Sequence, residues 1–176
     1  MSRSYSRASI LLHWLMLALL VAVYATIEGR TLFPRGSDIR ETVKSWHFIL
    51  GLTVFALVWL RIAARLRWPA PPLMPALPRW QMIASRAVHG FLYLMMICMP
   101  IAGWMILSGE GKTIPFWGLE LPPLISPDKA LAKQIEEVHG TVGEIGYWVI
   151  GLHALAALTH HYFWKDNSLR RMWFRG

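Results

Sequence analysis

Residues 138–163 read VHGTVGEIGYWVIGLHALAALTHHYF, and this stretch decides the fold. It holds one charged residue, Glu144, and four histidines in an otherwise largely apolar run. A helix needs about 20 mostly apolar residues to cross a bilayer, so the stretch is long enough to span one. Three more apolar stretches of sufficient length precede it, at residues 10–27, 46–64 and 82–107.

The composition also indicates a membrane protein. Of the 176 residues, 55% are apolar and only 16% are charged, and the mean hydropathy is +0.39. Ordinary soluble domains carry about 25% charged residues, so a soluble globular protein is excluded. We expect an all-α integral membrane four-helix bundle that forms a single domain over residues 1–176. Its helices are predicted at about residues 9–28, 45–65, 81–107 and 136–163.

Two connectors are rich in residues that interrupt helices. Residues 68–78 read WPAPPLMPALP, and proline lacks the amide donor and clashes with the preceding helical turn. Residues 108–124 are rich in glycine and proline. Ser126, Pro127 and Asp128 then predict a helix start with Ser126 as the N-cap, so the fourth helix should begin outside the bilayer.

The uneven distribution of charge predicts the orientation. The N-terminal tail, the second connector with its flanks and the C-terminal tail carry 11 of the 18 Lys and Arg residues and one acid, Asp166. The other side carries seven basic and nine acidic residues. Basic residues collect on the cytoplasmic side of membrane proteins, so both termini are expected in the cytoplasm. The net charge of +8 is therefore a topology signal, and no nucleic-acid partner is required.

Histidines inside the apolar stretches carry the chemistry. Seven are present, at positions 13, 47, 89, 139, 153, 160 and 161. A polar ring in hydrocarbon is costly unless it faces the bundle interior and finds a partner. His139 and His153 are 14 residues apart, which is nearly four helical turns and roughly 21 Å along the axis. Both rings therefore leave one face at two depths, the arrangement that two haems stacked across a bilayer require.

The number of residues between each histidine and a charged residue toward the outer end of its helix suggests a partner for His139, the outer of these two rings. His47 lies three residues inward from Lys44. His139 lies three residues inward from Glu136, so both rings sit just below the outer surface. We expect His47 and His139 to bind the iron of an outer haem.

The same comparison suggests a partner for the deeper ring. His13 is 15 residues inward from Glu28. His153 is 16 residues inward from Glu137, so these two share a level. We expect His13 and His153 to bind the iron of an inner haem. Bis-histidine ligation fills both axial positions, which favours electron transfer over oxygen binding.

His89 and Arg61 have two interpretations each. His89 lies at a depth near His13 and is the main rival ligand of the inner haem, or it lines a substrate pocket. Arg61 lies 14 residues after His47 on the same face, which brings it near the inner haem. It is expected either to pair with the haem propionates or to extend toward the membrane surface as a topology signal.

The adjacent His160 and His161 end the last apolar stretch. Such a pair at a helix end is predicted to consist of solvated interface residues. His160 also lies seven residues after His153 on the same face, so the alternative is that it donates protons or hydrogen bonds to a quinone.

The single cysteine, Cys98, limits the cofactor chemistry. One cysteine forms no intramolecular disulfide and no thiolate cluster for a metal. It lies in no Cys-x-x-Cys-His sequence, so any haem is expected to be noncovalent haem b. Cys98 is interpreted as a packing residue and the nine methionines as filling of the bundle interior.

These residues resemble a known family. His13 followed by Trp14 in the first span, His47 opening the second, and His139 with His153 in the fourth are similar to the bacterial cytochrome b561 family over essentially the whole chain. The resemblance extends to the membrane cytochrome b subunits of hydrogenases and formate dehydrogenases. It implies two b haems on these ligand pairs, quinone chemistry near the inner haem, and a multi-pass protein of the bacterial inner membrane.

Three functions follow as alternatives. The leading one is an oxidoreductase that takes electrons from a periplasmic donor, superoxide by resemblance to the small stand-alone members, and passes them to ubiquinone. The second is a quinone-linked anchor of a periplasmic hydrogenase or dehydrogenase. The third is a haem-free transporter whose histidines line a path. The short outer connectors offer a modest docking surface, which favours the first.

Overall fold

A computed structural model describes residues 4–173 as four long helices, a small hairpin and two short 3-10 turns. In chain order the elements are α1 (Arg7–Gly29), η1 (Arg30–Leu32), α2 (Asp38–Arg67), α3 (Arg79–Gly109), β1 (Ile114–Phe116), β2 (Leu119–Leu121), α4 (Lys129–Tyr162) and η2 (Arg170–Met172). All four α-helices are long and apolar enough to cross a membrane, which confirms the predicted helical membrane bundle.

The helices extend beyond the predicted spans because polar residues outside the bilayer continue them. The fourth helix begins at Lys129, well before residue 136. Its N-cap is Asp128, whose carboxylate accepts a hydrogen bond from the backbone of Leu131 at 3.0 Å. The prediction of Ser126 as the N-cap is therefore wrong, because the carboxylate directly before the helix satisfies the free amide.

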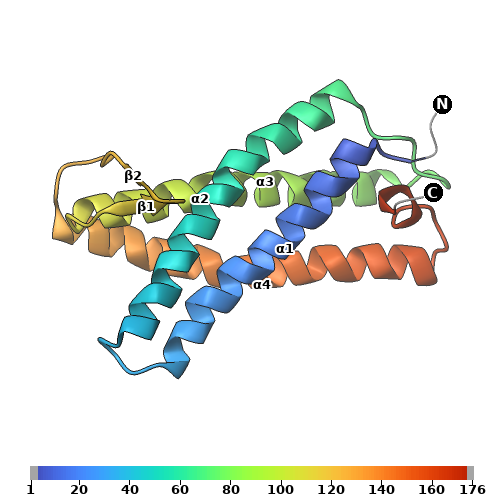
Figure 1. The fold of residues 1–176 in the computed structure, drawn as a ribbon. Coiled ribbons are helices and arrows are strands. Elements are labelled where there is room, and N and C mark those ends of the chain that lie inside the picture. Colours follow the sequence, from blue (N-terminus) through green and yellow to red (C-terminus); the bar gives the residue numbers. More distant parts are fainter. Residues whose placement is uncertain (1–3, 174–176) are drawn as a thin grey trace.

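The helices form two crossing pairs (Figure 1). α1 and α2 run antiparallel side by side, and α3 and α4 form a second antiparallel pair that crosses the first at a large angle. The backbones approach most closely within each pair and between α2 and α3. α4 therefore meets α1 and α2 mainly through side chains.

Methionines and valines fill the centre of the bundle. Met16, Val54, Val58 and Met96 form one buried cluster from α1, α2 and α3. The predicted role of methionine as interior filling is confirmed at Met16 and Met96, where the flexible thioether fits an irregular space.

The outside of the bundle is strongly apolar. Trp148 and Phe163 are each 81% exposed. Such a surface would promote aggregation in water, but it suits contact with lipid. Cys98 is exposed on α3, so the interpretation of Cys98 as a packing residue is wrong.

The connector after α3 contains a β-hairpin that the sequence analysis did not predict. β1 and β2 are antiparallel, with Ile114 opposite Leu121. Trp117 and Gly118 form the turn, and both have positive φ angles, of 50° and 84°. A two-residue turn of this kind matches the twist of the strands it joins.

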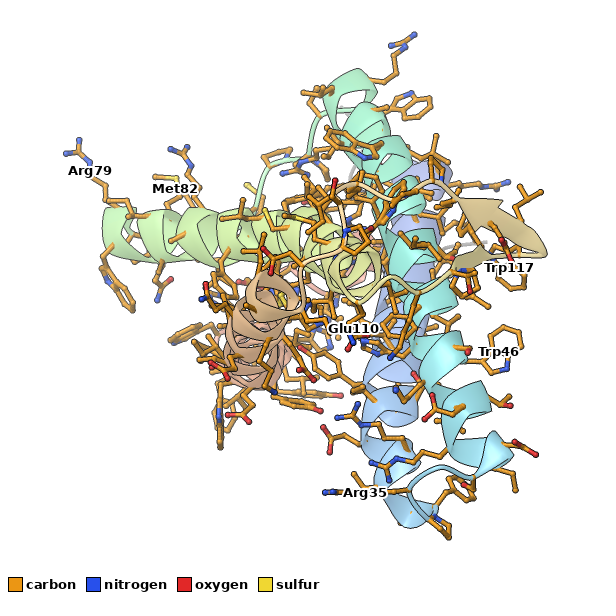
Figure 2. The ribbon with its side chains drawn as sticks, turned by 90° about the vertical axis from the view of Figure 1, so that its left-hand side faces the viewer. Arg35, Trp46, Arg79, Met82, Glu110 and Trp117 are labelled. Atoms are coloured by element: carbon orange, nitrogen blue, oxygen red, sulfur yellow. The ribbon has the colours of Figure 1, made fainter. Side chains whose placement is uncertain are left out.

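The hairpin packs on the outer half of α2. Ile114 is buried against Leu52 of α2. The indole nitrogen of Trp117 donates to the hydroxyl of Thr53 at 2.9 Å. Figure 2 shows Trp117 on the same side of the molecule as Trp46, and their ring centroids are 5.9 Å apart.

Both ends of the described chain lie at the other end of the bundle. The backbone amide of Tyr5 donates to the carbonyl of Arg171 at 3.1 Å. The indole of Trp14 donates to the carbonyl of Met172 at 2.9 Å. The two ends therefore share one side of the membrane; that this side is the cytoplasm stays a prediction.

Candidate functional site

The four predicted ligand residues form two pairs, each between α4 and another helix. The rings of His47 and His139 have centroids 6.2 Å apart and planes at 76°. The rings of His13 and His153 have centroids 6.2 Å apart and planes at 80°. We call His47 and His139 the outer pair and His13 and His153 the inner pair.

The spacing within each pair suits one metal ion between the rings. Metal–imidazole bonds are about 2.0 Å long and the bonded nitrogen lies about 1.1 Å from the ring centre, so two rings on opposite sides of a metal have centres about 6.2–6.4 Å apart. Both observed separations of 6.2 Å agree with this value. The geometry thus fits a haem iron with two axial histidines.

Hydrogen bonding prepares the outer pair for such an ion. Nδ1 of His47 lies 3.0 Å from the carbonyl oxygen of Val23. A carbonyl only accepts, so Nδ1 carries the proton and Nε2 keeps a free lone pair. Nδ1 of His139 is buried, and the ring lies close to the backbone of Met99.

A cavity of about 270 Å³ adjoins the outer pair. Both histidines of the pair line it, together with several glycines of α2, α3 and α4. A Cβ added at Gly103 would lie 3.7 Å from Cε1 of His139. A Cβ added at Gly51 or at Gly140 would have no neighbouring atom within 4 Å. Glycines at these places leave room for a flat group to approach the helix backbones.

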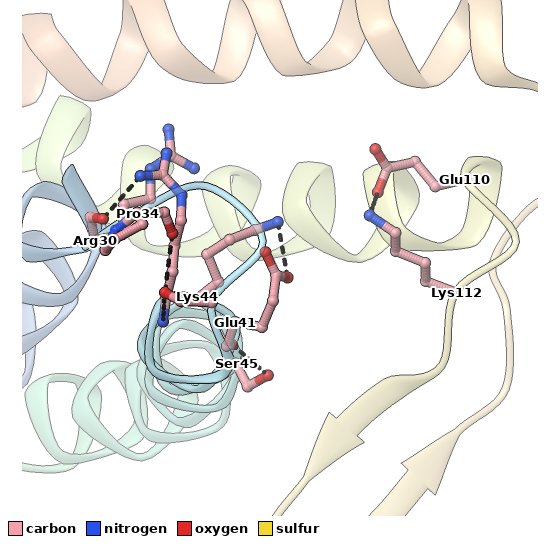
Figure 3. A network of polar contacts seen from close by, with 9 residues as sticks. Arg30, Pro34, Glu41, Lys44, Ser45, Glu110 and Lys112 are labelled. Atoms are coloured by element: carbon pink, nitrogen blue, oxygen red, sulfur yellow. Dashed lines mark hydrogen bonds and ion pairs between the residues drawn. The ribbon is translucent and has the colours of Figure 1, made fainter.

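Charged residues border the outer end of the cavity. Arg30 lines it, and its Nε is buried without a partner among the described residues. Nη1 of Arg40 donates to the carbonyls of Arg30 and Phe33 at 3.0 and 2.9 Å, which fixes the turn. Figure 3 shows this turn beside the ion pair of Lys44 with Glu41, which spans 3.3 Å.

The inner pair is held differently. Nη2 of Arg61 lies 3.0 Å from Nδ1 of His13. A guanidinium only donates, so Nδ1 accepts and the proton of a neutral ring lies on Nε2. Arg61 therefore lies at the inner pair, as its spacing predicted, but it contacts the histidine ring itself.

His89 also reaches the inner pair. Its ring centroid is 5.1 Å from that of His153, closer than the centroid of His13. Nδ1 of His89 lies 2.6 Å from the carbonyl of Ser85, one turn earlier in α3, so Nδ1 is the donor. The predicted position of His89 near the inner level is thus observed, and its Nε2 has no hydrogen bond within the described residues 4–173.

His160 pairs with an acid beyond the end of α4. Its Nδ1 lies 2.6 Å from the carboxylate of Asp166, and only 15% of the His160 side chain is exposed. Burial raises the pKa of Asp166, but hydrogen bonds from Ser168 and His160 outweigh it and hold that pKa below its ordinary value. The prediction of a solvated interface residue is therefore wrong for His160, whereas His161 is half-buried with its Nδ1 inside.

Comparison with known proteins places the chain in a family. A family model described as prokaryotic cytochrome b561 matches residues 4–175. The chain belongs to the prokaryotic cytochrome b561 family.

Relatives match this cytochrome over almost their whole lengths. Cytochrome b561 homolog 1 of Escherichia coli (strain K12) is 35% identical over 168 residues, which cover 96% of each chain. Probable superoxide oxidase CybB of Yersinia pestis is 37% identical over 172 residues, 98% of this chain and 97% of the relative. Cytochrome b562 of Cereibacter sphaeroides is 27% identical over 174 residues, 96% of this chain and 94% of the relative.

Membership confirms the coarse function. The cytochrome is a multi-pass bacterial membrane protein of electron transport, and its family implies that it binds b-type haem. Family membership therefore argues against the alternative of a haem-free transporter.

One group of polar contacts in this cytochrome was not predicted. The hydroxyl of Tyr24 donates to the carbonyl of Gly143 at 2.9 Å, and that of Tyr147 donates to Glu28 at 2.8 Å. The two tyrosine rings lie 4.2 Å apart and join α1 to α4 beside the outer pair. Gly143 and Gly146, three residues apart in α4, are the sequence feature that could have indicated this contact, because small residues permit close approach of two helices.

Proposed function

We propose that this cytochrome carries electrons from superoxide, on the side of the outer pair, through two haems to ubiquinone on the side of the chain ends. The observation that carries the proposal is the presence of two cross-helix histidine pairs, each with ring centroids 6.2 Å apart. His47 and His139 are assigned to an outer haem b, and His13 and His153 to an inner one. Bound haem supplies an iron that gains and loses single electrons.

The reaction balances without a proton at the outer site. Each superoxide anion gives up one electron and leaves as dioxygen. Two such oxidations supply the two electrons that, with two protons, convert ubiquinone to ubiquinol. The residues near the outer pair therefore need only admit and orient a small anion, whereas the residues at the other end must deliver protons.

Arg30 is the residue suited to attract the anion. It is the one lysine or arginine among the described residues that line the outer cavity. Glu28 and Glu144 line the cavity as well, but the carboxylate of Glu28 accepts a hydrogen bond from Tyr147 at 2.8 Å. Arg30 is thus the one positive charge on a cavity wall that also carries Glu144, and its field acts locally on a small anion.

His160 is the residue suited to deliver a proton to the quinone. Asp166 accepts the hydrogen bond of its Nδ1 at 2.6 Å and so fixes the orientation of the ring. Nε2 is then the atom that releases a proton to a quinone oxygen. A carboxylate at the opposite nitrogen fixes which ring nitrogen faces the quinone, as in other acid–base pairs.

Arg61 would give up its bond to His13 if His13 held a haem iron through Nε2. Iron binding through Nε2 requires the ring proton on Nδ1, the atom that now accepts from Arg61 at 3.0 Å. The carboxylates of a haem offer a guanidinium a stronger, charged acceptor. We therefore expect Arg61 to exchange the ring for a propionate when the inner site is filled.

The name of the Yersinia pestis relative, Probable superoxide oxidase CybB, supports superoxide as the donor. A stopped-flow experiment tests this choice: superoxide is mixed with the oxidised, haem-loaded protein in the presence of ubiquinone. We expect rapid haem reduction and one ubiquinol for every two superoxide ions. Haems that stay oxidised, in a preparation with full haem content, would refute superoxide as the donor.

Arginine variants make the test specific. Arg30→Gln should slow haem reduction by superoxide but not by dithionite, because only the anionic donor depends on the local field. Arg35→Gln is the matched control, since Arg35 is exposed near the same turn and points away from the bundle in Figure 2. If haem reduction instead requires a copurifying periplasmic subunit, the protein is an anchor for a dehydrogenase.

A further inference from the structure

The end of the bundle that holds both chain ends has a large excess of positive charge. The sequence assigns 11 of the 18 Lys and Arg residues to this side and only one acid, Asp166. The carboxylate of Asp166 is already engaged by His160 at 2.6 Å and by the backbone of Ser168 at 2.8 Å. The arginines here therefore have little negative charge to pair with.

Two of these arginines converge on one tyrosine. The guanidinium of Arg65, in the last turn of α2, lies 5.4 Å from the ring centroid of Tyr5. The guanidinium of Arg171, in η2, lies 5.5 Å from the same centroid. The backbone amide of Tyr5 also donates to the carbonyl of Arg171 at 3.1 Å, which fixes the three residues relative to one another.

The two guanidinium groups are not neutralised by the protein. Neither Arg65 nor Arg171 forms an ion pair with a carboxylate within residues 4–173. One nitrogen of Arg171 donates to the carbonyl of Pro71, but its Nε is buried without a partner. Burial lowers the pKa of Arg171, and the charge of Arg65 lowers it further, although Tyr5 and Asp166 act in the opposite direction.

The position of the cluster identifies the anion that would relieve this repulsion. Arg65 lies two residues before the end of a membrane helix, and Trp14 and Trp173 pack edge to face nearby with centroids 6.1 Å apart. Tryptophans collect at the level of the lipid headgroups. Phosphate oxygens are the anions present in quantity at that depth, and arginine binds them through two parallel hydrogen bonds.

We propose that Arg65, Arg171 and Tyr5 form a binding site for the phosphate of an anionic phospholipid headgroup. The two guanidinium groups bind the phosphate oxygens, and Tyr5 holds the arginines at a fixed spacing. Bound lipid thereby ties the end of α2 to the C-terminal segment. The site is independent of the haems and of the electron donor.

Native mass spectrometry of the detergent-solubilised, haem-loaded protein tests this site with phosphatidylglycerol as the probe. The main variant is Arg65→Gln, because Arg65 forms no hydrogen bond within residues 4–173 and its loss should leave the structure intact. We expect its dissociation constant for the first phosphatidylglycerol to rise about tenfold or more, the effect of losing one charged hydrogen-bonding partner. Arg65→Lys should recover part of the affinity.

The control is Arg79→Gln, which removes the same charge from the start of α3. Arg79 extends away from the bundle in Figure 2 and should have little effect on lipid affinity. An equal loss of phosphatidylglycerol affinity in the Arg65 and Arg79 variants would overturn the proposal, because it would indicate general attraction to anionic lipid. Displacement of the lipid by millimolar inorganic phosphate would also overturn it, because the site would then select free phosphate.

Arg171→Gln serves as a second variant with a separate readout. Its side chain also bonds to Pro71, so this change is expected to weaken lipid binding and lower the unfolding temperature. Added phosphatidylglycerol should raise the unfolding temperature of the natural protein and of Arg79→Gln, but not of either Arg65→Gln or Arg171→Gln. Equal stabilisation of all four proteins would contradict the proposed site.

Discussion

Arg61 donates from Nη2 to Nδ1 of His13 over 3.0 Å. In the outer pair the direction of the bond is reversed, because Nδ1 of His47 donates to the carbonyl of Val23 over 3.0 Å. Arg61 lies beside the inner pair whether it contacts His13 or a haem propionate, so the proposed inner haem has a cation nearby and the outer ligand has a neutral acceptor. A nearby cation stabilises the reduced, less positive iron, whereas a carbonyl acceptor makes the imidazole a stronger donor and stabilises the oxidised iron. The inner haem is therefore expected to have the higher potential.

Arg61→Gln should lower the midpoint potential of one haem and leave the other in place. A unit charge near a redox centre, at an effective dielectric of about 20, contributes on the order of 1–2 kcal/mol. For a one-electron couple this corresponds to a fall of tens of millivolts. Potentiometric titration followed by optical absorbance measures both potentials in one sample. Equal shifts in the two haems would contradict a local effect of Arg61.

Alanine substitutions of the four proposed ligands should fall into two classes. His47→Ala and His139→Ala should remove the same haem, because both histidines of a pair are needed to hold the iron. His13→Ala and His153→Ala should remove the other haem for the same reason. Haem content per chain and reduced-minus-oxidised spectra measure the loss. A double variant that lacks both histidines of one pair should lose no more haem per chain than either single variant does.

His89 and His161 provide the comparison for those variants. We expect His89→Ala and His161→Ala to keep two haems per chain. Loss of the inner haem in His89→Ala, with retention in His13→Ala, would show that His89 is the ligand, since its ring lies 5.1 Å from that of His153. That result would replace His13 in the proposed inner pair.

The four helices and the meeting of the histidines could be predicted from sequence. Helix positions follow from the length of the apolar runs, and the 14-residue spacing of His139 and His153 fixes two levels on one helix face. The ring separations of 6.2 Å agree with the predicted partners, His47 and His13. Whether iron binds there is tested by the variants above.

Contacts that depend on how the chain turns between helices could not be predicted. Trp117 occupies a left-handed turn position, at a φ of 50°, that its side chain disfavours. Its hydrogen bond to Thr53, 64 residues away in the sequence, stabilises the turn, and no local pattern signals it. The pairing of His160 with Asp166 likewise depends on a reversal after α4, where Lys165 has a φ of 52°.

Gly146→Ala should destabilise the bundle. A Cβ at this position would lie 2.3 Å from the hydroxyl oxygen of Tyr24 and 2.7 Å from the sulfur of Met95. Both side chains would have to move, and Tyr24 would lose its bond to the carbonyl of Gly143. Overpacking of this kind costs about 1–3 kcal/mol, measurable as a lower unfolding temperature in detergent.

Gly151→Ala is the matched control for that substitution. A Cβ at Gly151 meets no atom within 4 Å, and the residue lies in the same helix. Alanine has a higher helix propensity than glycine by roughly 1 kcal/mol, so this variant should be as stable as the natural protein or more so. Equal destabilisation by the two substitutions would refute the assigned contact of Tyr24 with α4.

Asp166→Asn should remove one source of acid sensitivity at the end that holds both chain termini. Hydrogen bonds from Ser168 and His160 outweigh burial and hold the pKa of Asp166 in the folded protein below its ordinary value of 3.8. A group with a depressed pKa stabilises the fold fully above its unfolded pKa, and this contribution is lost as the pH falls through the folded pKa. The unfolding temperature of the natural protein should therefore fall below about pH 4. Asp166→Asn should have a lower unfolding temperature at pH 7, and that temperature should fall less on acidification.

Since Asp166 also orients His160, the same variant should slow ubiquinol formation while haem reduction by superoxide stays unchanged. A variant with the acid profile and ubiquinol rate of the natural protein would show that the carboxylate acts on neither.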